Sequence, residues 1–295
     1  MMRIIRKQMQ GRQMKLDILT AGESTVPPNY MIEGMFSLWR NAGWDILIRP
    51  AGAISRTPDV SICHVDRTYI DEAVMRRETA IAPVINGAVT DISKRRISSA
   101  LVAQADDYAG PVIVKSNLNF HGSAERRARP FAARAMDALI RKAKTALPDN
   151  MRRAPIHYDY PIYDQKEDAP AWIWRDQNYI VERFMPERDG ELYVTRSWVF
   201  FGNRNHVRLC RSTSPIVKSE NTVSHDVLDT VPPELEAVRR SFGFDYGKFD
   251  YVEIDGVAVL LDANRTPTMT GRTPRHMELL EHFATGLGGF TRTTP

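Results

Sequence analysis

The sequence predicts a mixed α/β (α+β) fold, with a small parallel α/β unit near the N-terminus followed by two α+β lobes. Strand-like hydrophobic runs alternate with a helical pattern early in the chain, which is typical of parallel strands joined by helices. Later runs are joined by two-residue turns, which indicates antiparallel hairpins. A chain of 295 residues, 43% of them hydrophobic, can bury a core and divide into lobes around one cleft.

The N-terminal unit is predicted to follow a disordered extension over residues 1–13, with Met14 as an alternative start. It contains one helix, which begins near Met31 and ends near Gly43. Its strands are predicted at residues 15–19, 44–48, 59–64 and 80–85. Because ligands of open parallel sheets bind beyond the carboxyl ends of the strands, His64, Asp66 and Arg67 are candidates for substrate contact. A hydrogen-bonded structural role for the histidine is the alternative.

Two lysines are candidates for binding an anion. Lys115 ends the apolar strand predicted at residues 110–115, and burying its stem is costly unless the ammonium meets an anion such as a phosphate. Lys94 lies near the start of a predicted helix that Asp91 or Ser93 can cap. A helix predicted at residues 126–147 and a long loop over 158–174, interpreted as a lid, follow Lys115.

The loop at residues 119–125 is a candidate phosphate-binding loop. Gly122 allows close backbone approach, and Ser123 offers a hydroxyl. An ordinary turn is the alternative interpretation.

Asp250, Asp262 and Asn264 form the most informative cluster. They lie on two predicted strands, 249–253 and 259–264, and Asp255-Gly256 is a suitable turn between them. Side chains alternate along a strand, so residues 262 and 264 share a face, and a hairpin can bring all three onto one hard cation. Oxygen ligands suit magnesium that carries nucleotide phosphates better than zinc. A surface hairpin with satisfied polar ends is the alternative.

In order and spacing, these residues resemble the ATP-grasp superfamily over about residues 84–275. Chains of that family typically end the last core strand in an acidic residue, a spacer, Asn and a Pro-containing loop, as in the run from Asp262 to Pro267. The resemblance implies an N-terminal domain over residues 14–90 and a small lobe over 91–180 with an inserted helix and the lid loop. A C-terminal lobe over 181–295 would carry the metal site, and the two lobes would clamp a nucleotide.

The resemblance also implies the nucleotide contacts. The strand predicted at residues 179–185 is the expected hinge, with Glu182 at the adenine edge and Arg183 and Met185 lining the same pocket. Glu191 would take the ribose hydroxyls, with Asp189 as the second choice. The cofactor-binding set is completed by the phosphate contacts Lys94, Lys115, Gly122 and Ser123.

Four arginines are expected near the reacting groups. Strands predicted at residues 192–201 and 205–211 carry Arg196 and Arg211, which the resemblance implies face the transferred phosphate. Cross-strand charge balancing is the alternative. Arg272 and Arg275 flank the start of a helix near Pro274, where related ligases hold a substrate carboxylate or an acyl phosphate.

The implied reaction depends on ATP and Mg²⁺, with Mn²⁺ as an alternative. A carboxylate of a small molecule or peptide attacks the γ-phosphorus to give an acyl phosphate, and an amine or other nucleophile then displaces phosphate. A phosphotransferase on the same scaffold is one alternative. A degenerate nucleotide-binding or scaffold protein is another, because the phosphate loop has a single glycine and Asp262 stands where the family more often has Glu.

Composition narrows the partners. The 36 acidic and 40 basic residues are intermixed without an aromatic stripe, so we expect no nucleic acid. Without a run approaching the roughly 20 apolar residues that span a bilayer, and without a signal-peptide pattern, we expect a cytoplasmic location and no membrane partner. Cys63 and Cys210 lack metal-ligand spacing and are interpreted as buried free thiols. A homodimer is left open.

Overall fold

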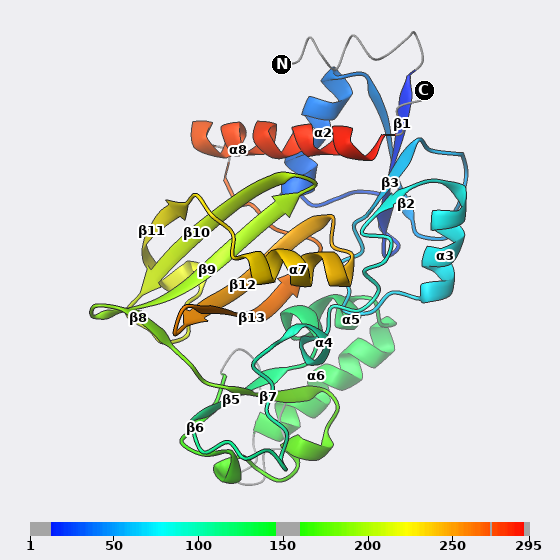
Figure 1. Cartoon of the computed structure of the whole chain (residues 1–295). Helices are drawn as coiled ribbons and strands as arrows, with labels where there is room; N and C mark the ends of the chain where they lie inside the picture. The colour runs from blue at the N-terminus through cyan, green and yellow to red at the C-terminus, as the bar shows by residue number, and fades with distance from the viewer. Residues whose placement is uncertain (1–12, 146–159, 272, 292–295) are drawn as a thin grey trace.

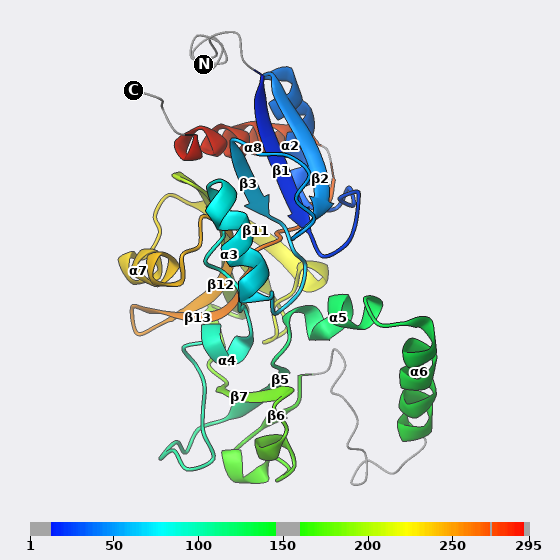
Figure 2. The ribbon, with the colours of Figure 1, turned by 90° about the vertical axis from the view of Figure 1, so that its right-hand side faces the viewer.

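The computed structural model describes residues 13–145, 160–271 and 273–291, and its strands form three sheets (Figures 1 and 2). The helices are α2 (Met31–Asn41), α3 (Glu72–Ile81), α4 (Lys94–Ile97), α5 (Ser123–Arg127), α6 (Phe131–Thr145), α7 (Pro233–Phe242) and α8 (Pro274–Ala284). Short 3-10 turns are η1 (Asn119–Gly122), η3 (Lys166–Asp168), η4 (Ile173–Arg175), η5 (Ser219–Asn221) and η6 (Thr285–Phe290). The predicted α/β (α+β) class is therefore confirmed.

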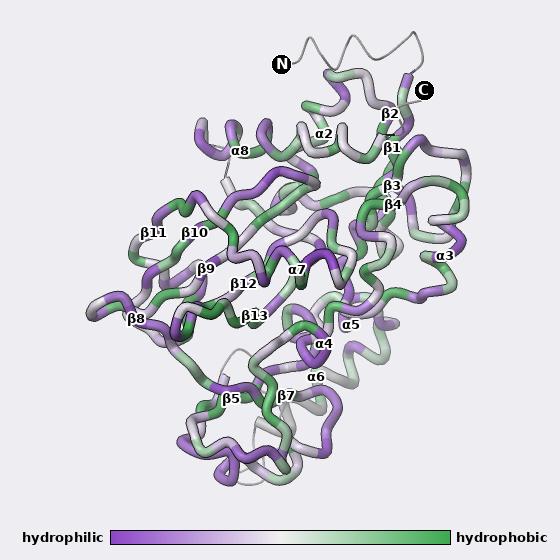
Figure 3. The backbone as a smooth tube through the Cα atoms, viewed as in Figure 1, coloured by the Kyte–Doolittle hydropathy of each residue, from purple (hydrophilic) through white to green (hydrophobic). Residues whose placement is uncertain are grey.

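The N-terminal sheet is parallel, with strand order β2-β1-β3-β4. Its strands carry mostly hydrophobic residues (Figure 3) and are β1 (Met14–Thr20), β2 (Trp44–Pro50), β3 (Val60–Cys63) and β4 (Val84–Ile85). The strand predicted at residues 80–85 is too long, because α3 continues to Ile81. Asp71 caps the start of α3 by accepting a hydrogen bond from the Ala73 amide, and Pro83 follows soon after its end.

Helix α8, from the C-terminal end of the chain, packs beside α2 of the N-terminal unit (Figures 1 and 2). The Trp39 indole donates a hydrogen bond of 2.9 Å to the carbonyl of Ala284. The same hydrophobic core contains Phe201 and Tyr246 from the largest sheet. The N-terminal unit and the C-terminal part of the chain therefore share one core.

The largest sheet is antiparallel, with order β11-β10-β9-β12-β13 and with β8 paired to β9. Its strands are β8 (Glu187–Asp189), β9 (Leu192–Phe201), β10 (Arg204–Ser212), β11 (Thr222–Leu228), β12 (Tyr246–Ile254) and β13 (Val257–Asn264). One face is covered by α7, whose Leu235 packs with Trp198, Phe200 and Phe249. The predicted turn at Asp255-Gly256 is confirmed, with φ of 52° and 77°.

The third sheet is small, with order β6-β5-β7, and its strands are β5 (Val112–Ser116), β6 (Ile162–Tyr163) and β7 (Tyr179–Arg183). The single helix predicted over residues 126–147 is instead the pair α5 and α6, and Pro130 lies at the break between them. Phe131 and Leu139 of α6 are exposed, and the helix lies to the side of the molecule in Figure 2. The predicted loop at 158–174 is described from residue 160 and contains β6, η3 and η4.

Asn86 joins the N-terminal unit to the largest sheet. Its φ is 61°, a left-handed conformation that asparagine tolerates better than most residues. Its side-chain amide donates to the carbonyl of Tyr246 at 2.6 Å, and its side-chain oxygen accepts from the amides of Asp245 and Tyr246. These bonds fix the end of β4 to the start of β12.

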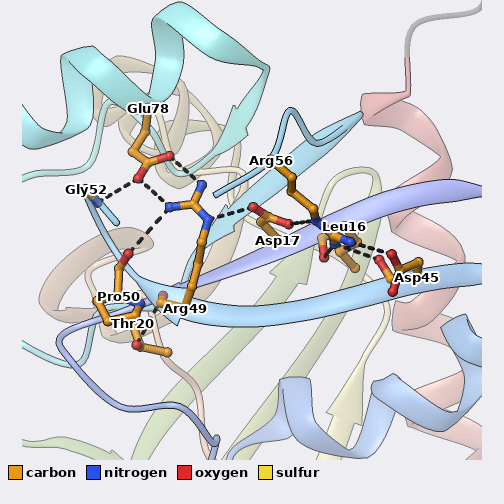
Figure 4. Close-up of polar contacts among 9 residues, drawn as sticks. All are labelled: Leu16, Asp17, Thr20, Asp45, Arg49, Pro50, Gly52, Arg56 and Glu78. Carbon is orange, nitrogen blue, oxygen red and sulfur yellow. Dashed lines mark hydrogen bonds and ion pairs between the residues drawn. The ribbon is translucent and has the colours of Figure 1, made fainter. Parts of the chain in front are cut away.

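A buried ionic network stabilises the N-terminal unit (Figure 4). Arg49, in β2, donates to Asp17 at 2.6 Å and to both carboxylate oxygens of Glu78 at 2.7 Å. Arg56 donates to the other oxygen of Asp17 at 2.7 Å and also pairs with Asp45. Burial alone would raise the pKa of Glu78, but the hydrogen bonds from Arg49 and the Gly52 amide lower it below its ordinary value. The network fixes α3 against the sheet.

His64, the predicted substrate contact that follows β3, is 4% exposed. Its ring meets Tyr30 edge-on at 4.9 Å between centroids, and neither ring nitrogen has a hydrogen-bond partner among the described residues. Burial, aided by the positive charge of Arg265, lowers its pKa to about 4. His64 is therefore a neutral core residue at neutral pH.

We expect Arg49→Met to destabilise the fold by about 3–5 kcal/mol, because it leaves the buried Glu78 carboxylate without its cation. Urea unfolding at pH 7 measures this difference. The matched control is Arg76→Gln, which removes an exposed partner of Glu72 at 3.8 Å and should cost less than about 0.5 kcal/mol. Because the pKa of Glu78 is depressed, its stabilisation is present above pH 4.5 and is lost at lower pH, so the difference should shrink there. Equal stability of the two variants would contradict the network's role.

His64→Leu should reduce the sensitivity of stability to mild acid. With a pKa of about 4 in the folded state against an ordinary 6.5, protonation favours the unfolded chain as pH falls through this window. At pH 5 this costs the wild type about 2 kcal/mol relative to pH 7.5. Urea unfolding at both pH values should show the variant losing about 2 kcal/mol less than the wild type. An unchanged pH dependence would show that folding does not lower the pKa of His64.

Candidate functional site

A cleft of about 1620 Å³ lies between the largest sheet, the β5-β7 sheet, α8 and the N-terminal unit. The face of the largest sheet opposite α7 forms one wall of this cleft. Alternate residues of β9, β10 and β12 line it, among them Ser197, Arg208 and Asp250. Some of the predicted site residues line this cleft and others do not.

The three residues predicted to hold a cation all line the cleft. Asp250 of β12 lies directly opposite Asp262 of β13, and the strand register shifts immediately after Asp250. Such a bulge re-aims side chains and is common next to functional sites. Asn264 lies opposite Lys248, and its side-chain oxygen accepts from the amide and the hydroxyl of Thr266. The hairpin that the sequence predicts thus brings its oxygens to one wall.

Each of the two carboxylates is paired with a lysine through one oxygen. Lys94 Nζ lies 3.0 Å from Oδ1 of Asp262, and Lys248 Nζ lies 2.8 Å from Oδ2 of Asp250. Burial alone would lower the pKa of both lysines, but these carboxylates raise it above the ordinary value. The second oxygen of each carboxylate makes no hydrogen bond with any residue that the structure describes.

Lys115 and Glu182 form a further ion pair. They lie on the neighbouring strands β5 and β7, on the side of the cleft opposite the largest sheet. Lys115 Nζ lies 2.5 Å from Oε2 of Glu182, whose side chain is fully buried. Oε1 of Glu182 is buried without a hydrogen-bond partner in the described chain. Arg183 and Met185, the other predicted hinge residues, also line the cleft. The hinge therefore offers one unsatisfied buried acceptor.

The predicted phosphate loop forms η1 and the start of α5. Phe120, His121 and Gly122 have positive φ values of 41°, 53° and 67°, which is costly for the first two. His121 lines the cleft, whereas Gly122 and Ser123 are not among its lining residues. The loop is held by Thr68, whose hydroxyl accepts from the Asn119 amide at 2.9 Å.

The structure places Arg196 and Arg211 outside the cleft, contrary to the expectation that they face it. Arg196 lies opposite Tyr251 and shares the sheet face of Trp198, where it pairs with Glu187 and, at 3.0 Å, with Glu253. Arg211 pairs with Asp189 at 2.7 Å and Asp226 at 2.6 Å. The physical reason is the two-residue alternation of strands, which points these positions away from Asp250. Both arginines therefore form ion pairs with acidic residues of neighbouring strands, which is the alternative role considered for them.

Strand register identifies the arginine that sequence reasoning missed. Asp250 lies opposite Ser197 of β9, and Ser197 lies opposite Arg208 of β10, so all three share one face. Lys248 and His206 flank Val199 in the next row of the same face. The alternation of side chains along β9 and β10 shows that Ser197 and Arg208 share a face. Their position beside Asp250 follows only from the pairing of β9 with β12, which the sequence does not reveal.

The remaining predicted residues are spread around the site. Asp66 lines the cleft and accepts a 2.5 Å hydrogen bond from the Tyr30 hydroxyl, whereas the Arg67 side chain turns to the carbonyl of Ala21. Arg275, near the start of α8, lines the cleft. Glu191 is exposed in the turn after β8 and is not among the lining residues. Arg272 lies outside the described residues.

The described residues contain no group of three or more His, Cys, Asp or Glu placed to share a metal ion, so a cation here would depend on the two aspartates and Asn264. None of their helices combines the length and the apolar character needed to cross a bilayer.

No protein-family model matches the sequence, and no curated protein matches it. Solved structures do match its fold. The ATP-grasp ligase PsnB, solved with a minimal precursor, has a TM-score of 0.53 at 8% identity, with 94% of this chain and 100% of that chain covered. D-cycloserine synthetase DcsG gives 0.51 at 13% identity, with 93% and 99% covered. D-alanine–D-alanine ligase from Bacillus anthracis gives 0.51 at 11% identity, with 95% and 97% covered. The chain therefore has the fold of the ATP-grasp superfamily.

Proposed function

We propose that the protein is an ATP-dependent ligase that activates a substrate carboxylate and joins it to an amine or another nucleophile. One observation carries the proposal: Asp250 and Asp262 lie side by side on one wall of a cleft into which Lys94 and Lys115 also reach. Anion-binding and cation-binding groups in one cleft suit a nucleotide phosphate chain with its divalent ion. The structural neighbours described as ligases and a synthetase support the assignment at the level of the fold.

The residues present fit a magnesium ion. Asp250 and Asp262 each keep one carboxylate oxygen without a hydrogen bond in the described chain, and all three predicted ligands offer oxygen only, as hard cations prefer. When bound, Mg²⁺ or Mn²⁺ would neutralise charge on the phosphate oxygens. Lys94 and Lys248 each neutralise one of the two carboxylates.

The nucleotide would lie along β7 and β5. The unsatisfied Oε1 of Glu182 is a suitable acceptor for the adenine amino group, and Met185 supplies an apolar contact. Lys115 and Lys94 would bind the phosphates as point charges. The backbone of the loop at residues 119–122 approaches the same region through His121. Glu191, Gly122 and Ser123 stay predictions, because their side chains are not among the lining residues.

The reaction requires a carboxylate oxygen of the substrate to attack the γ-phosphorus, with ADP as the leaving group. An acceptor amine then adds to the acyl carbon, loses a proton and expels phosphate, so that an amide forms. Lys248 and Lys94 are the cleft cations placed to stabilise the charge of the transferred phosphoryl group. The role expected of Arg196 and Arg211 passes to Lys248 in this proposal, and Arg272 stays a prediction.

Calorimetric titration with Mg²⁺ and a non-hydrolysable ATP analogue tests the nucleotide site. Asp262→Ala and Lys115→Ala should each weaken binding by at least about tenfold, because each removes a charged contact worth roughly 1.5–3 kcal/mol. Glu72→Ala, which removes an exposed carboxylate on α3, is the control and should bind like the wild type. Equal affinity in all four proteins would remove the site assignment.

Product analysis separates the ligase from a phosphotransferase on the same fold. We expect release of ADP and phosphate only when a carboxylate and an amine are both supplied, together with a condensed product. A stable phosphorylated product formed without the amine would instead favour direct phosphoryl transfer to a hydroxyl. Nucleotide binding without turnover across carboxylate and amine pools would favour a non-catalytic binding protein.

A further inference from the structure

We propose that the part of the cleft formed by β10, β11 and α8 binds an acidic side chain of a peptide substrate, at a place separate from the carboxylate that is activated. This inference rests on the proposed ligase function and names its substrate class. Five residues make up this part of the cleft, which we call the basic wall: His206, Arg208, His225, Arg275 and His282.

The register of the sheet fixes where the basic wall lies. His206 and Arg208 share the face of β10 that lines the cleft, and His225 lies opposite Cys210 on the same face of the edge strand β11. Helix α8 packs against β9 and β10 and adds Arg275 and His282. Arg208 lies two strands from Asp250, a spacing of about 10 Å.

The two arginines of the basic wall lack acidic partners in the described part of the chain. Lys94, Lys115 and Lys248 are each within 3.0 Å of a carboxylate oxygen. In contrast, neither Arg208 nor Arg275 forms an ion pair with any residue that the structure describes. The Nε of Arg208 is buried and has no hydrogen-bond partner there. A buried guanidinium donor without an acceptor indicates a place for an anionic ligand.

The positive charges of the basic wall act on its histidines, whose pKa values are lowered. Burial and then the charges of Arg208, Arg275, His282 and His225 lower the pKa of His206 to about 4. The charge of Arg208 is the largest cause of the lowered pKa of His225, followed by burial and Arg275. At neutral pH both imidazoles are therefore uncharged in the free protein and can donate one N–H each to a ligand. The acidic residues nearby are Glu278 on α8, Glu220, which lies 4.0 Å from Lys218, and Asp226, which acts to raise the pKa of His225 and is paired with Arg211 at 2.6 Å.

The chemistry favours a carboxylate on a peptide. A guanidinium fork matches the planar carboxylate, and imidazole N–H groups add neutral donors. An extended peptide advances about 3.3–3.6 Å per residue, so an acidic side chain two or three residues from the reacting carboxylate reaches about 10 Å away. The cleft also exceeds the roughly 300–1,000 Å³ that holds one drug-sized ligand, which leaves room for a peptide beside a nucleotide.

Calorimetric titration of penta-glutamate into the protein saturated with Mg²⁺ and a non-hydrolysable ATP analogue tests this inference. Penta-glutamate should bind at least about tenfold more tightly than penta-glutamine. Arg208→Gln and Arg275→Gln should each weaken penta-glutamate binding by about tenfold or more, because each removes a charge-assisted contact. Arg76→Gln, which removes an exposed positive charge from α3, should leave it unchanged. Unaltered nucleotide affinity of the variants shows that they are folded.

Three outcomes would overturn the inference. Equal affinity for the two peptides would show that the wall does not select carboxylates. An equal loss of nucleotide and penta-glutamate affinity in both arginine variants would assign the basic wall to the nucleotide phosphates. Tighter binding of the small dicarboxylate glutarate than of penta-glutamate would exclude a peptide as the preferred ligand. Failure of the wild type to bind the nucleotide analogue, with penta-glutamate still bound through Arg208, would remove the proposed ligase function while leaving the anion site in place.

Discussion

The arrangement of the cleft depends on the guanidinium of Arg265, which is fully buried and pairs with no acidic residue in the described part of the chain. It donates to the carbonyls of Val65, at 3.0 Å, and Val89, at 2.6 Å, and it also reaches Arg67 and Thr68. A buried charge is tolerated only when its donors are satisfied, and backbone carbonyls do this here. Burial lowers the pKa of Arg265 below its ordinary value. Because Arg265 directly follows Asn264, the end of β13 is fixed to two loops of the N-terminal unit.

Through the loop at residues 65–68, this constraint extends to the rest of the site. Asp66 accepts from the Thr266 hydroxyl at 3.1 Å, and the Thr68 amide donates to Glu125 at 2.6 Å. The end of β13, the loop at residues 65–68 and the predicted phosphate loop are thus joined by a few hydrogen bonds. Residues that are about 200 positions apart in the sequence therefore take defined places in one cleft. The three lysine–carboxylate pairs then balance much of its charge before any ligand binds.

Sequence reasoning succeeded where the signals were local. The hairpin from Tyr246 to Asn264 was predictable because its turn requires positive φ at two positions that carry Asp255 and Gly256. Helix α2 was predictable from the spacing of its hydrophobic residues and from Gly43, which follows soon after its last residue. Lys115 was predictable because an apolar strand carries it into the cleft.

Sequence reasoning failed where residues distant in sequence determine the direction or the environment of a side chain. Arg196 and Arg208 are on neighbouring strands and look equivalent in the sequence, yet the pairing of β9 with β12 turns only Arg208 toward Asp250. The buried, unpartnered state of His64 depends on Tyr30 and Arg265, neither of which is close in sequence. The C-terminal end of α3 was missed because Ala80 and Ile81 extend the hydrophobic run that leads into β4.

The two faces of β10 contact different surroundings, and this affects how the ligand selectivity of the cleft can change by substitution. Val207 and Leu209 point into the hydrophobic core, while His206, Arg208 and Cys210 point into the cleft. Exchanges at the even-numbered positions alter what the cleft recognises without disturbing core packing, so a combinatorial library restricted to them should keep folding intact. Deleting one residue from the tight turn at Gly202 would do the reverse, because it would exchange the roles of the two faces along the strand.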